Sequence, residues 1–355
     1  MIRFATKTDI PAIMQFIDTH WKKDHILARD RAFFEYQYVT DEHVTFVVSE
    51  CDGAAGTTAQ TFNGILGYIP YDHAQKNISL ALWKALKSED GMVGLQLLDY
   101  LQKQLQPDII ATPGVDPDTT RAIYKLFRYE VGIMRHFYRL MNRPSYRIAA
   151  ATDATGALSP VLPPSGDMES VPSVTSVPNT TVTRLTTFDE YRKARIFFAA
   201  HAIPKEDRYI EKRYFNHPVY TYEKILVRRA ASDALLIIAR VQEAQDSACL
   251  RIVDLIGDYS LLSRGTAALE TLCTEYDCEY IDCYAAGIAP ELFEEAGFTE
   301  RPPVSSSHDG TVSDRGIIIP NHFAPFERKN VDIWYSCLPA KTVILRGDGD
   351  QDRPS

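Results

Sequence analysis

The chain has 355 residues, a length that predicts about two domains. Its apolar fraction of 45% and charged fraction of 24% are ordinary for a globular protein. The net charge of −9 argues against a nucleic-acid surface, although a local basic patch can still bind an anionic small molecule.

The N-terminal residues and the cysteines bear on the compartment. The start, MIRFATKTDIP, has no apolar stretch of signal-peptide length, and no run of about 18 apolar residues occurs in the chain. Cys273, Cys278 and Cys283 are five residues apart, unlike the CxxC spacing of metal sites. Cys249 and Cys283 lie in apolar runs, as core thiols do. We therefore expect a cytoplasmic protein with reduced thiols, no membrane segment and no metal.

The first half carries a strand, two helices, three strands, a helix, a strand, a helix and a strand. Thr8 and Asp9 cap the first helix, and Pro11 lies in its first turn, where proline is tolerated. The expected ranges are strand Ile2–Ala5, helices from Ile10 and over Ala28–Tyr38, strands Val44–Ser49, Ile65–Pro70 and Ile78–Leu86, helix Gly94–Leu105 and strand Ile109–Ala111.

Residues 149–180 separate the two halves of the chain. They are rich in Ala, Ser, Thr, Pro and Val and keep no amphipathic period, which predicts a linker or a long crossover. We therefore expect one domain over 1–148, a second over 181–340, and a polar, disordered tail over 341–355.

The second half repeats the order of the first. The expected ranges are strand Val182–Leu185, helices Phe188–Ala200 and Asp207–Phe215, strands Lys224–Arg228, Leu235–Val241 and Cys249–Ile256, and helix Gly265–Tyr276. Each half then closes with a strand, a helix and an aromatic stop: Ile109–Ala111, Tyr124 and Arg128-Tyr129 in the first; Glu279–Tyr284, Gly287–Ala296 and Gly297-Phe298 in the second. Two copies of one pattern indicate a repeated fold.

This closing pattern resembles the last motif of the GCN5-related N-acetyltransferase (GNAT) superfamily. The resemblance implies an α/β fold of two tandem domains, each a central mixed β-sheet flanked by helices. It also implies an acyl-coenzyme A donor. In this family, a loop between a central strand and a helix binds the coenzyme A pyrophosphate through backbone N–H groups and the helix dipole.

The family loop pattern, Arg/Gln-x-x-Gly-x-Gly/Ala, falls on Lys87–Gly94 and keeps two glycines, Gly91 and Gly94. The alternative is a plain turn that uses glycine for a positive φ. The resemblance implies these donor-binding residues: Leu82, Leu86, Lys87, Ser88, Gly91, Met92, Val93, Gly94, Leu95 and Tyr124.

The two halves differ at the positions that matter for the donor. The equivalent loop of the second half, Asp258–Gly265, keeps only Gly265. In the family, a tyrosine before the Gly-Phe stop protonates the departing thiolate. Tyr124 takes that position in the first half and Phe293 in the second, and phenylalanine has no proton to give. We expect the donor on the first half; the alternative for Tyr124 is an aromatic packed on the sheet.

The acceptor amine must lose a proton, and a carboxylate or histidine is the usual base. His25 lies between the first two helices, and Asp72 and His73 follow the strand Ile65–Pro70. Asp254 lies within an apolar strand, where a carboxylate is costly unless it is paired. Tyr124, Asp254 and His25 are the expected catalytic residues.

Each of these base candidates also has a structural interpretation. The alternative for Asp254 is a salt bridge to Arg240 or Arg251, and a lone histidine such as His25 is more often structural. The choice of base stays open at this point.

The stretch Ile319–Tyr335 is dense in aromatic and hydrogen-bonding residues. It can stack a base and hold a sugar, or it can be a loop packed against the last strand. Together with HWKKDHILARDRAFFEYQY, it resembles bacterial N-acyltransferases of nucleotide-linked amino sugars, of the type that moves 3-hydroxybutanoyl from coenzyme A to a dTDP-linked 3-amino sugar. The substrate-binding residues expected in a cleft between the halves are His25, Asp72, His73, Asn321, His322, Phe326, Arg328, Lys329 and Trp334.

Two other functions compete with a sugar N-acyltransferase. A tandem aminoacyl transferase that uses aminoacyl-tRNA would favour a basic face, which a net charge of −9 does not support. A coenzyme-A-sensing or structural pseudo-acetyltransferase would explain the degenerate loop at Lys87–Gly94.

Overall fold

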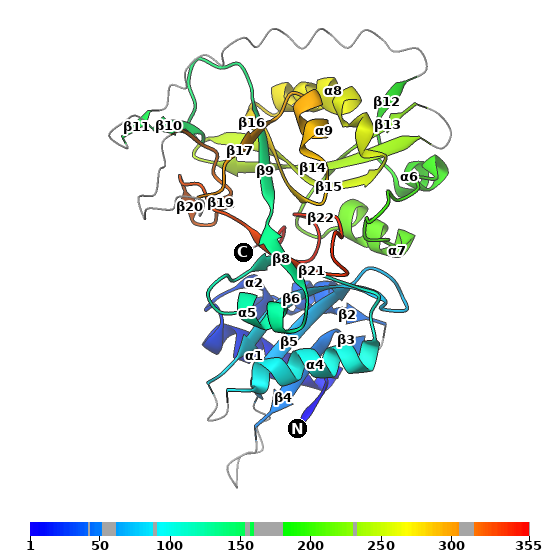
Figure 1. The fold of residues 1–355 in the computed structure, drawn as a ribbon, viewed down its shortest axis with the longest axis vertical. Helices are drawn as coiled ribbons and strands as arrows, with labels where there is room; N and C mark the ends of the chain where they lie inside the picture. Colours follow the sequence, from blue (N-terminus) through cyan, green and yellow to red (C-terminus); the bar gives the residue numbers. More distant parts are fainter. Residues whose placement is uncertain are drawn as a thin grey trace.

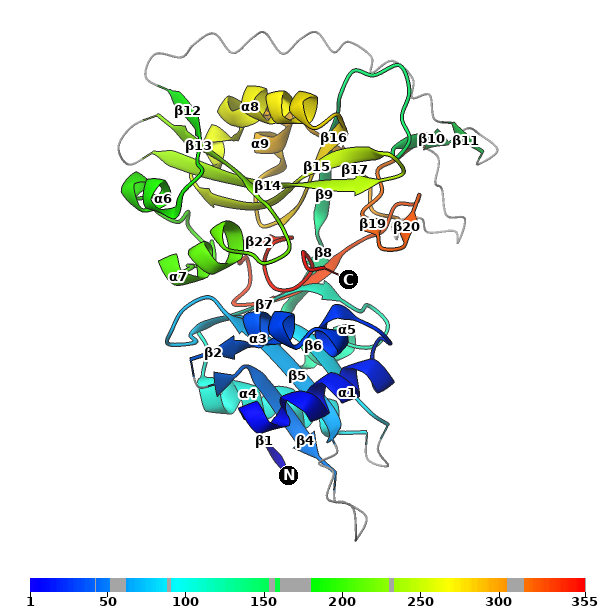
Figure 2. The same cartoon turned by 180° about the vertical axis from the view of Figure 1, so that it is seen from behind.

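The chain forms two β-sheets that lie one above the other along the long axis of the molecule (Figures 1 and 2). This computed structural model describes residues 1–41, 43–51, 62–87, 91–152, 157–159, 180–229, 233–304 and 316–354. Among these residues, no helix is both long and apolar enough to cross a bilayer.

The first sheet has seven strands in the order β1-β4-β5-β6-β7-β21-β8. Its strands are β1 Ile2–Phe4, β4 Phe46–Glu50, β5 Phe62–Pro70, β6 Asn77–Ala85, β7 Ile109–Val115, β8 Glu130–Ile133 and β21 Trp334–Leu338. Helices α1 (Ile10–His20), α2 (Ile26–Arg29) and α3 (Arg31–Tyr38) pack on one face, and α4 (Val93–Leu105) and α5 (Arg121–Leu126) pack on the other.

The second sheet repeats this plan around the order β12-β13-β14-β15-β16-β9-β17. Its strands are β9 Arg135–Leu140, β12 Thr181–Arg184, β13 Glu223–Arg228, β14 Ala234–Ala244, β15 Ser247–Gly257, β16 Cys278–Ala286, β17 Thr299–Arg301 and β22 Ile344–Leu345, which pairs with β16. Helices α8 (Leu262–Glu275) and α9 (Pro290–Glu295) cover one face; α6 (Phe188–Ala194), α7 (Asp207–Ile210) and the π-helical turn η2 (Glu211–Phe215) cover the other.

The remaining elements are short. They are the one-turn helices η1 Lys7–Asp9 and η3 Tyr259–Leu261, the hairpins β2 Val39–Thr40 with β3 His43–Val44 and β19 His322–Phe323 with β20 Phe326–Glu327, and a small sheet of β10 Ala150–Thr152, β11 Leu158–Ser159 and β18 Ile317–Ile318. The expected fold class, two mixed sheets each flanked by helices, is confirmed.

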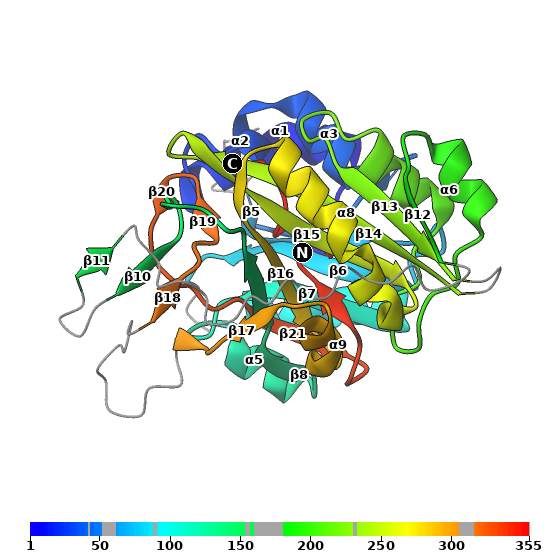
Figure 3. The ribbon, with the colours of Figure 1, turned by 90° about the horizontal axis from the view of Figure 1, so that it is seen from above.

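The two halves exchange strands. β9 follows β8 directly in the chain, but it leaves the first sheet and pairs with β16 in the second. In return, β21 enters the first sheet and pairs with β7 on one side and β8 on the other. Figure 3 shows β21 beside β7, although the two strands are far apart in sequence. Each sheet therefore needs a strand from the other half, and the expected division at residue 148 is crossed by backbone pairing in both directions.

Several expected elements have different bounds, and three of the differences have a clear local reason. The helix over Ala28–Tyr38 is interrupted at Asp30, which has φ −111° and whose carboxylate accepts the Phe33 N–H as the N-cap of α3. Helix Phe188–Ala200 ends at Ala194, because Arg195 adopts the left-handed conformation with φ 48°. Strand β7 continues past Ala111 through Pro113, whose missing N–H is tolerated there because β6 no longer pairs with β7 at this point.

The segment 341–354 lies between the two halves, although its composition suggests disorder. Most of its residues are buried, Asp348 and Asp352 included. Asp348 pairs with Lys205, and the Asp352 carboxylate accepts hydrogen bonds from Arg240 at 2.7 and 3.0 Å and from the Tyr222 hydroxyl at 2.7 Å. Apolar contacts of Val343, Ile344 and Leu345 hold the start of this segment in the interior, and ion pairs hold the residues that follow.

Candidate active site

Strands β6 and β7 of the first sheet pair at one end and separate at the other. Among the described residues, their parallel pairing covers only Asn77–Ser79 against Ile109–Ala111. Beyond that point β6 continues to Ala85 and β7 to Val115 without pairing with each other. Two strands that separate in this way present unpaired backbone groups to a ligand that enters between them.

Three hydroxyl groups gather beside this opening. Tyr124 of α5 is 2% exposed, with its ring edge-on to Trp83 of β6 at a centroid distance of 5.6 Å. Burial raises the pKa of Tyr124 to about 12. The nearby hydroxyls of Thr112 and Ser336 have a smaller, opposite effect on this pKa. Tyr124 therefore keeps its proton at neutral pH and is chemically able to act as an acid.

Thr112 and Ser336 face each other across the β7–β21 pairing. Both hydroxyls are buried, and apart from the Tyr124 hydroxyl beside them neither has a polar partner among the described residues. A buried polar group without a partner costs about 1–3 kcal/mol, so these hydroxyls are suited to a polar atom of a ligand. Ser336 belongs to the exchanged strand, which means that the second half of the sequence completes this site.

The N-terminus of α4 lies at the open end of β6. Gly91 has φ 62°, which favours glycine, whereas a side chain at Gly94 would meet Trp83 only at 3.7 Å. Val93 is buried against the sheet, and Leu82 and Leu86 pack towards the opposite face, in the cluster of α1–α3. Lys87, Met92 and Leu95 flank this helix start, and Ser88 lies outside the described residues.

The equivalent opening of the second half is filled by the chain itself. β22 pairs with the end of β16 through Ala285 and Ala286, and the Gly347 N–H donates to the Val253 carbonyl of β15 at 2.7 Å. Segment 344–347 thus bridges the ends of β15 and β16. Phe293, the counterpart of Tyr124, is fully buried and stacks on Phe137 at 3.9 Å.

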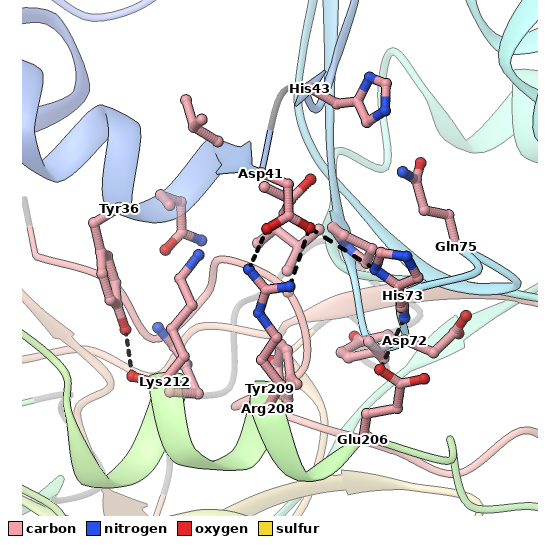
Figure 4. Close-up of a pocket in the computed structure, with 18 residues that line it drawn as sticks. Tyr36, Asp41, His43, Asp72, His73, Gln75, Glu206, Arg208, Tyr209 and Lys212 are labelled. Carbon is pink, nitrogen blue, oxygen red and sulfur yellow. Dashed lines mark hydrogen bonds and ion pairs between the residues drawn. The ribbon is translucent and has the colours of Figure 1, made fainter.

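A cavity of about 190 Å³ lies between the halves, near the end where β6 and β7 are paired (Figure 4). The first half contributes Tyr36, Gln37, Val39, Thr40, Asp41, His43, Ile69, Pro70, Tyr71, Asp72, His73 and Gln75; the second half contributes Glu206, Arg208, Tyr209, Lys212, Arg213 and Gly349. Asp72 and His73 are the two expected acceptor residues that line it. The helix α7 and the η2 turn supply residues that the sequence analysis did not single out.

Gly349 joins this cavity to the opening between β6 and β7. It lines the cavity, and a Cβ at this position would lie 2.3 Å from the Ser79 Oγ and 3.5 Å from Pro113 Cδ. Ser79 is the last residue of β6 that pairs with β7. The φ of 73° at Gly349 also favours glycine. Gly349 is thus in contact with both the cavity and the start of the opening.

The other expected acceptor residues lie away from the cavity. His25 is buried as the N-cap of α2, where its Nδ1 accepts the Leu27 N–H at 3.2 Å. Burial lowers the pKa of His25 to about 3, with smaller contributions from the charges of Arg353, Lys22 and Arg29, so the ring is neutral.

Asp254 is fully buried and forms an ion pair, but not with either expected arginine. Its Oδ2 accepts from Lys205 Nζ and, at 2.7 Å, from the Tyr214 hydroxyl. Arg240 instead pairs with Asp352, and Arg251 with Asp282. These partners come from segments distant in sequence, which spacing alone does not indicate.

The aromatic-rich stretch forms local contacts. Asn321 donates to the Val331 carbonyl, His322 and Lys329 pair with Glu327, and Arg328 donates to the Arg147 carbonyl. The rings of Phe326 and Phe323 are in contact. Trp334 lies on β21 beneath the Arg121 guanidinium, 5.2 Å from the ring centroid. Within the described chain, none of these residues lines the cavity.

Comparison with known proteins gives likeness in structure only. No family model and no curated protein matches the chain. A protein of Enterococcus faecalis described as a probable N-acyltransferase matches over 85% of this chain and 70% of its own, with 10% identity and a TM-score of 0.54.

Two GCN5-related N-acetyltransferases also match the structure. The protein of Anabaena variabilis has 10% identity, with 95% of this chain and 72% of that chain covered and a TM-score of 0.47. The protein of Sphaerobacter thermophilus also has 10% identity, and the match covers 95% of this chain and 94% of that chain with a TM-score of 0.42. At these identities, the E. faecalis match shows a shared fold.

Proposed function

We propose that the protein is an N-acyltransferase that moves an acyl group from an acyl-coenzyme A to an amine. The observation that carries this proposal is the opening between β6 and β7, with the Tyr124 hydroxyl beside it. The fold of the protein is also shared with the E. faecalis protein described as a probable N-acyltransferase.

The donor is assigned to the first half. An acyl-pantetheine arm carries amide and carbonyl groups. These groups suit the free edges of β6 and β7 and the buried hydroxyls of Thr112 and Ser336. The start of α4 at Gly91–Gly94 offers backbone N–H groups for its pyrophosphate. In the second half, segment 344–347 takes the corresponding space, and Phe293 has no proton to donate.

In the proposed reaction, Tyr124 donates its proton to the thiolate that leaves. The amine approaches from the cavity past Gly349, and a base removes its proton. Of the candidate bases, His73 has the most accessible position, with its Nδ1 3.9 Å from Asp41 in the cavity wall. Asp72 accepts the backbone N–H groups of Lys76 and Asn77. Asp254 is paired with Lys205, and His25 caps α2, so both already have partners.

A finer proposal names the acceptor as a nucleotide-linked amino sugar and the donor as 3-hydroxybutanoyl-coenzyme A. Its support is the resemblance of two sequence stretches, and it is separate from the assignment of the donor site. The cavity between two domains is a favoured place for such a ligand.

The test is a thiol-release assay with several acyl-coenzyme A donors and a panel of amines that includes dTDP-linked amino sugars. Release that depends on the amine, and is lost in Tyr124→Phe, is the expected result. Stable binding of coenzyme A without turnover of any amine would favour the coenzyme-A-sensing protein. Transfer from aminoacyl-tRNA, with no coenzyme A binding, would favour the tRNA-dependent transferase.

A further inference from the structure

The η2 turn places two consecutive cationic residues in the wall of the cavity between the halves. Arg213 is 4% exposed and lines the cavity. Its Nη2 donates to the Asp352 carbonyl, while its Nε and Nη1 have no partner among the described residues. Two unpaired N–H groups on one buried guanidinium are costly, and an anionic oxygen in the cavity would satisfy one of them and offset the buried charge.

Lys212 adds a second positive charge from the same turn. Its Nζ lies 4.9 Å from the centroid of the Tyr36 ring, and its side chain extends from the helix towards α3 (Figure 4). Burial, with Arg208 and Arg213 nearby, lowers the pKa of Lys212 to about 8. Among the described residues, no carboxylate forms an ion pair with it.

The acidic groups of the cavity already have partners. Asp41 accepts from the Arg208 guanidinium at 2.9 and 3.1 Å, and Glu206 accepts the His73 N–H at 2.9 Å. Asp72 accepts two backbone N–H groups. The unsatisfied side of the cavity is therefore the cationic side, and Asp352, the carboxylate nearest to Arg213, is shared with Arg240.

We propose that this cavity binds an acidic group, a carboxylate or a phosphoryl group, at Arg213 and Lys212. Resting on the proposed function, this makes the acceptor an amine that also carries an acidic group. The acidic group is held on the η2 turn, and the amine points towards Gly349 and the start of the opening between β6 and β7. The site differs from Arg328 and Lys329, the cationic residues among the substrate-binding residues expected from the sequence.

The test is calorimetric titration of the full chain with inorganic phosphate and, separately, with glutarate, in the presence of saturating coenzyme A to occupy the anion site at α4. Wild-type protein should bind at least one probe, and the stronger probe identifies the acidic group. Arg213→Met and Lys212→Met keep the apolar stems and should each weaken binding at least tenfold. Arg229→Met, which removes an equal charge at the exposed end of β13, should change the Kd less than twofold.

Absence of binding of either probe to the wild-type protein, or unchanged binding in both variants, would overturn the proposal. If Arg213→Met loses its cooperative melting transition, Lys212→Met decides alone. Coenzyme A binding is measured in the same samples. Probe binding that persists in a protein unable to bind coenzyme A would contradict the proposed function and leave the anion site standing.

Discussion

Replacing Asp352 by asparagine tests whether the segment 341–354 is part of the folded interior. The Asp352 side chain is buried and contacts Arg240 of β14, Arg213 of the η2 turn and Tyr222, the residue before β13. Asparagine keeps the shape but removes the charge, which leaves two buried guanidinium groups without their carboxylate. Loss of one partner from a buried ion pair costs about 3–5 kcal/mol.

Urea unfolding followed by tryptophan fluorescence measures this cost. We expect Asp352→Asn to lower the free energy of unfolding by about 3–5 kcal/mol. The matched control is Asp99→Asn, which breaks an exposed pair with Lys103 and should cost less than about 0.5 kcal/mol. Equal unfolding curves for Asp352→Asn and the wild-type protein would show that the segment is not held by this carboxylate, and would refute the reasoning.

The same carboxylate predicts a pH dependence. Burial alone would raise the pKa of Asp352, but the charges of Arg240 and Arg213 hold it below its ordinary value. A lowered pKa in the folded state stabilises the protein above the unfolded-state pKa of about 4, and this contribution is lost as the pH falls towards the folded-state pKa. The stability difference between the wild-type protein and Asp352→Asn should therefore shrink below about pH 4.

The remaining predictions concern the candidate active site. Tyr124→Phe should lower kcat about 10- to 1000-fold and leave the Kd of coenzyme A nearly unchanged by calorimetry; a wild-type kcat would assign Tyr124 to packing. Gly94→Leu should raise the KM for the donor, whereas Gly265→Leu should lower the melting temperature instead, because a Cβ there would lie 2.4 Å from Ile237 Cδ1; equal increases in KM would contradict the assignment of the donor to the first half. His73→Gln should lower kcat about 100-fold in the thiol-release assay, while unchanged turnover would exclude it as the base.

Sequence patterns predict the repeated architecture because local signals specify it. The helix with Tyr124, the paired closing motifs and the start of α4 each follow from periodicity, glycine positions and capping residues within about 15 neighbouring positions. The correspondence between Tyr124 and Phe293 also follows from the repeat, once the two closing motifs are aligned.

The strand exchange and the buried segment 341–354 do not follow from local signals. No strand is expected at Trp334–Leu338 from the sequence, where β21 lies, and its pairing with β7 and β8 depends on where the rest of the chain lies. The polar residues of segment 341–354 suggest disorder because they are held by ion pairs with residues distant in sequence, such as Arg240 and Lys205.

The cavity could have been predicted only in part. Asp72 and His73 follow a strand and are readily picked out as candidates. Arg208 and Lys212 are four residues apart, on one face of the predicted helix Asp207–Phe215, and this spacing was the available signal. The burial of Arg213 depends on the π-helical turn and on Asp352, which no local pattern indicates.

The central claim is that the donor binds between β6 and β7 of the first half. Hydrogen–deuterium exchange with mass spectrometry, with and without coenzyme A, tests it most directly. We expect coenzyme A to slow exchange in residues 80–85, 91–97 and 112–115, and to leave residues 253–257 and 284–286 unchanged. Protection of 253–257 and 284–286 with none at 80–85 and 112–115 would contradict the claim.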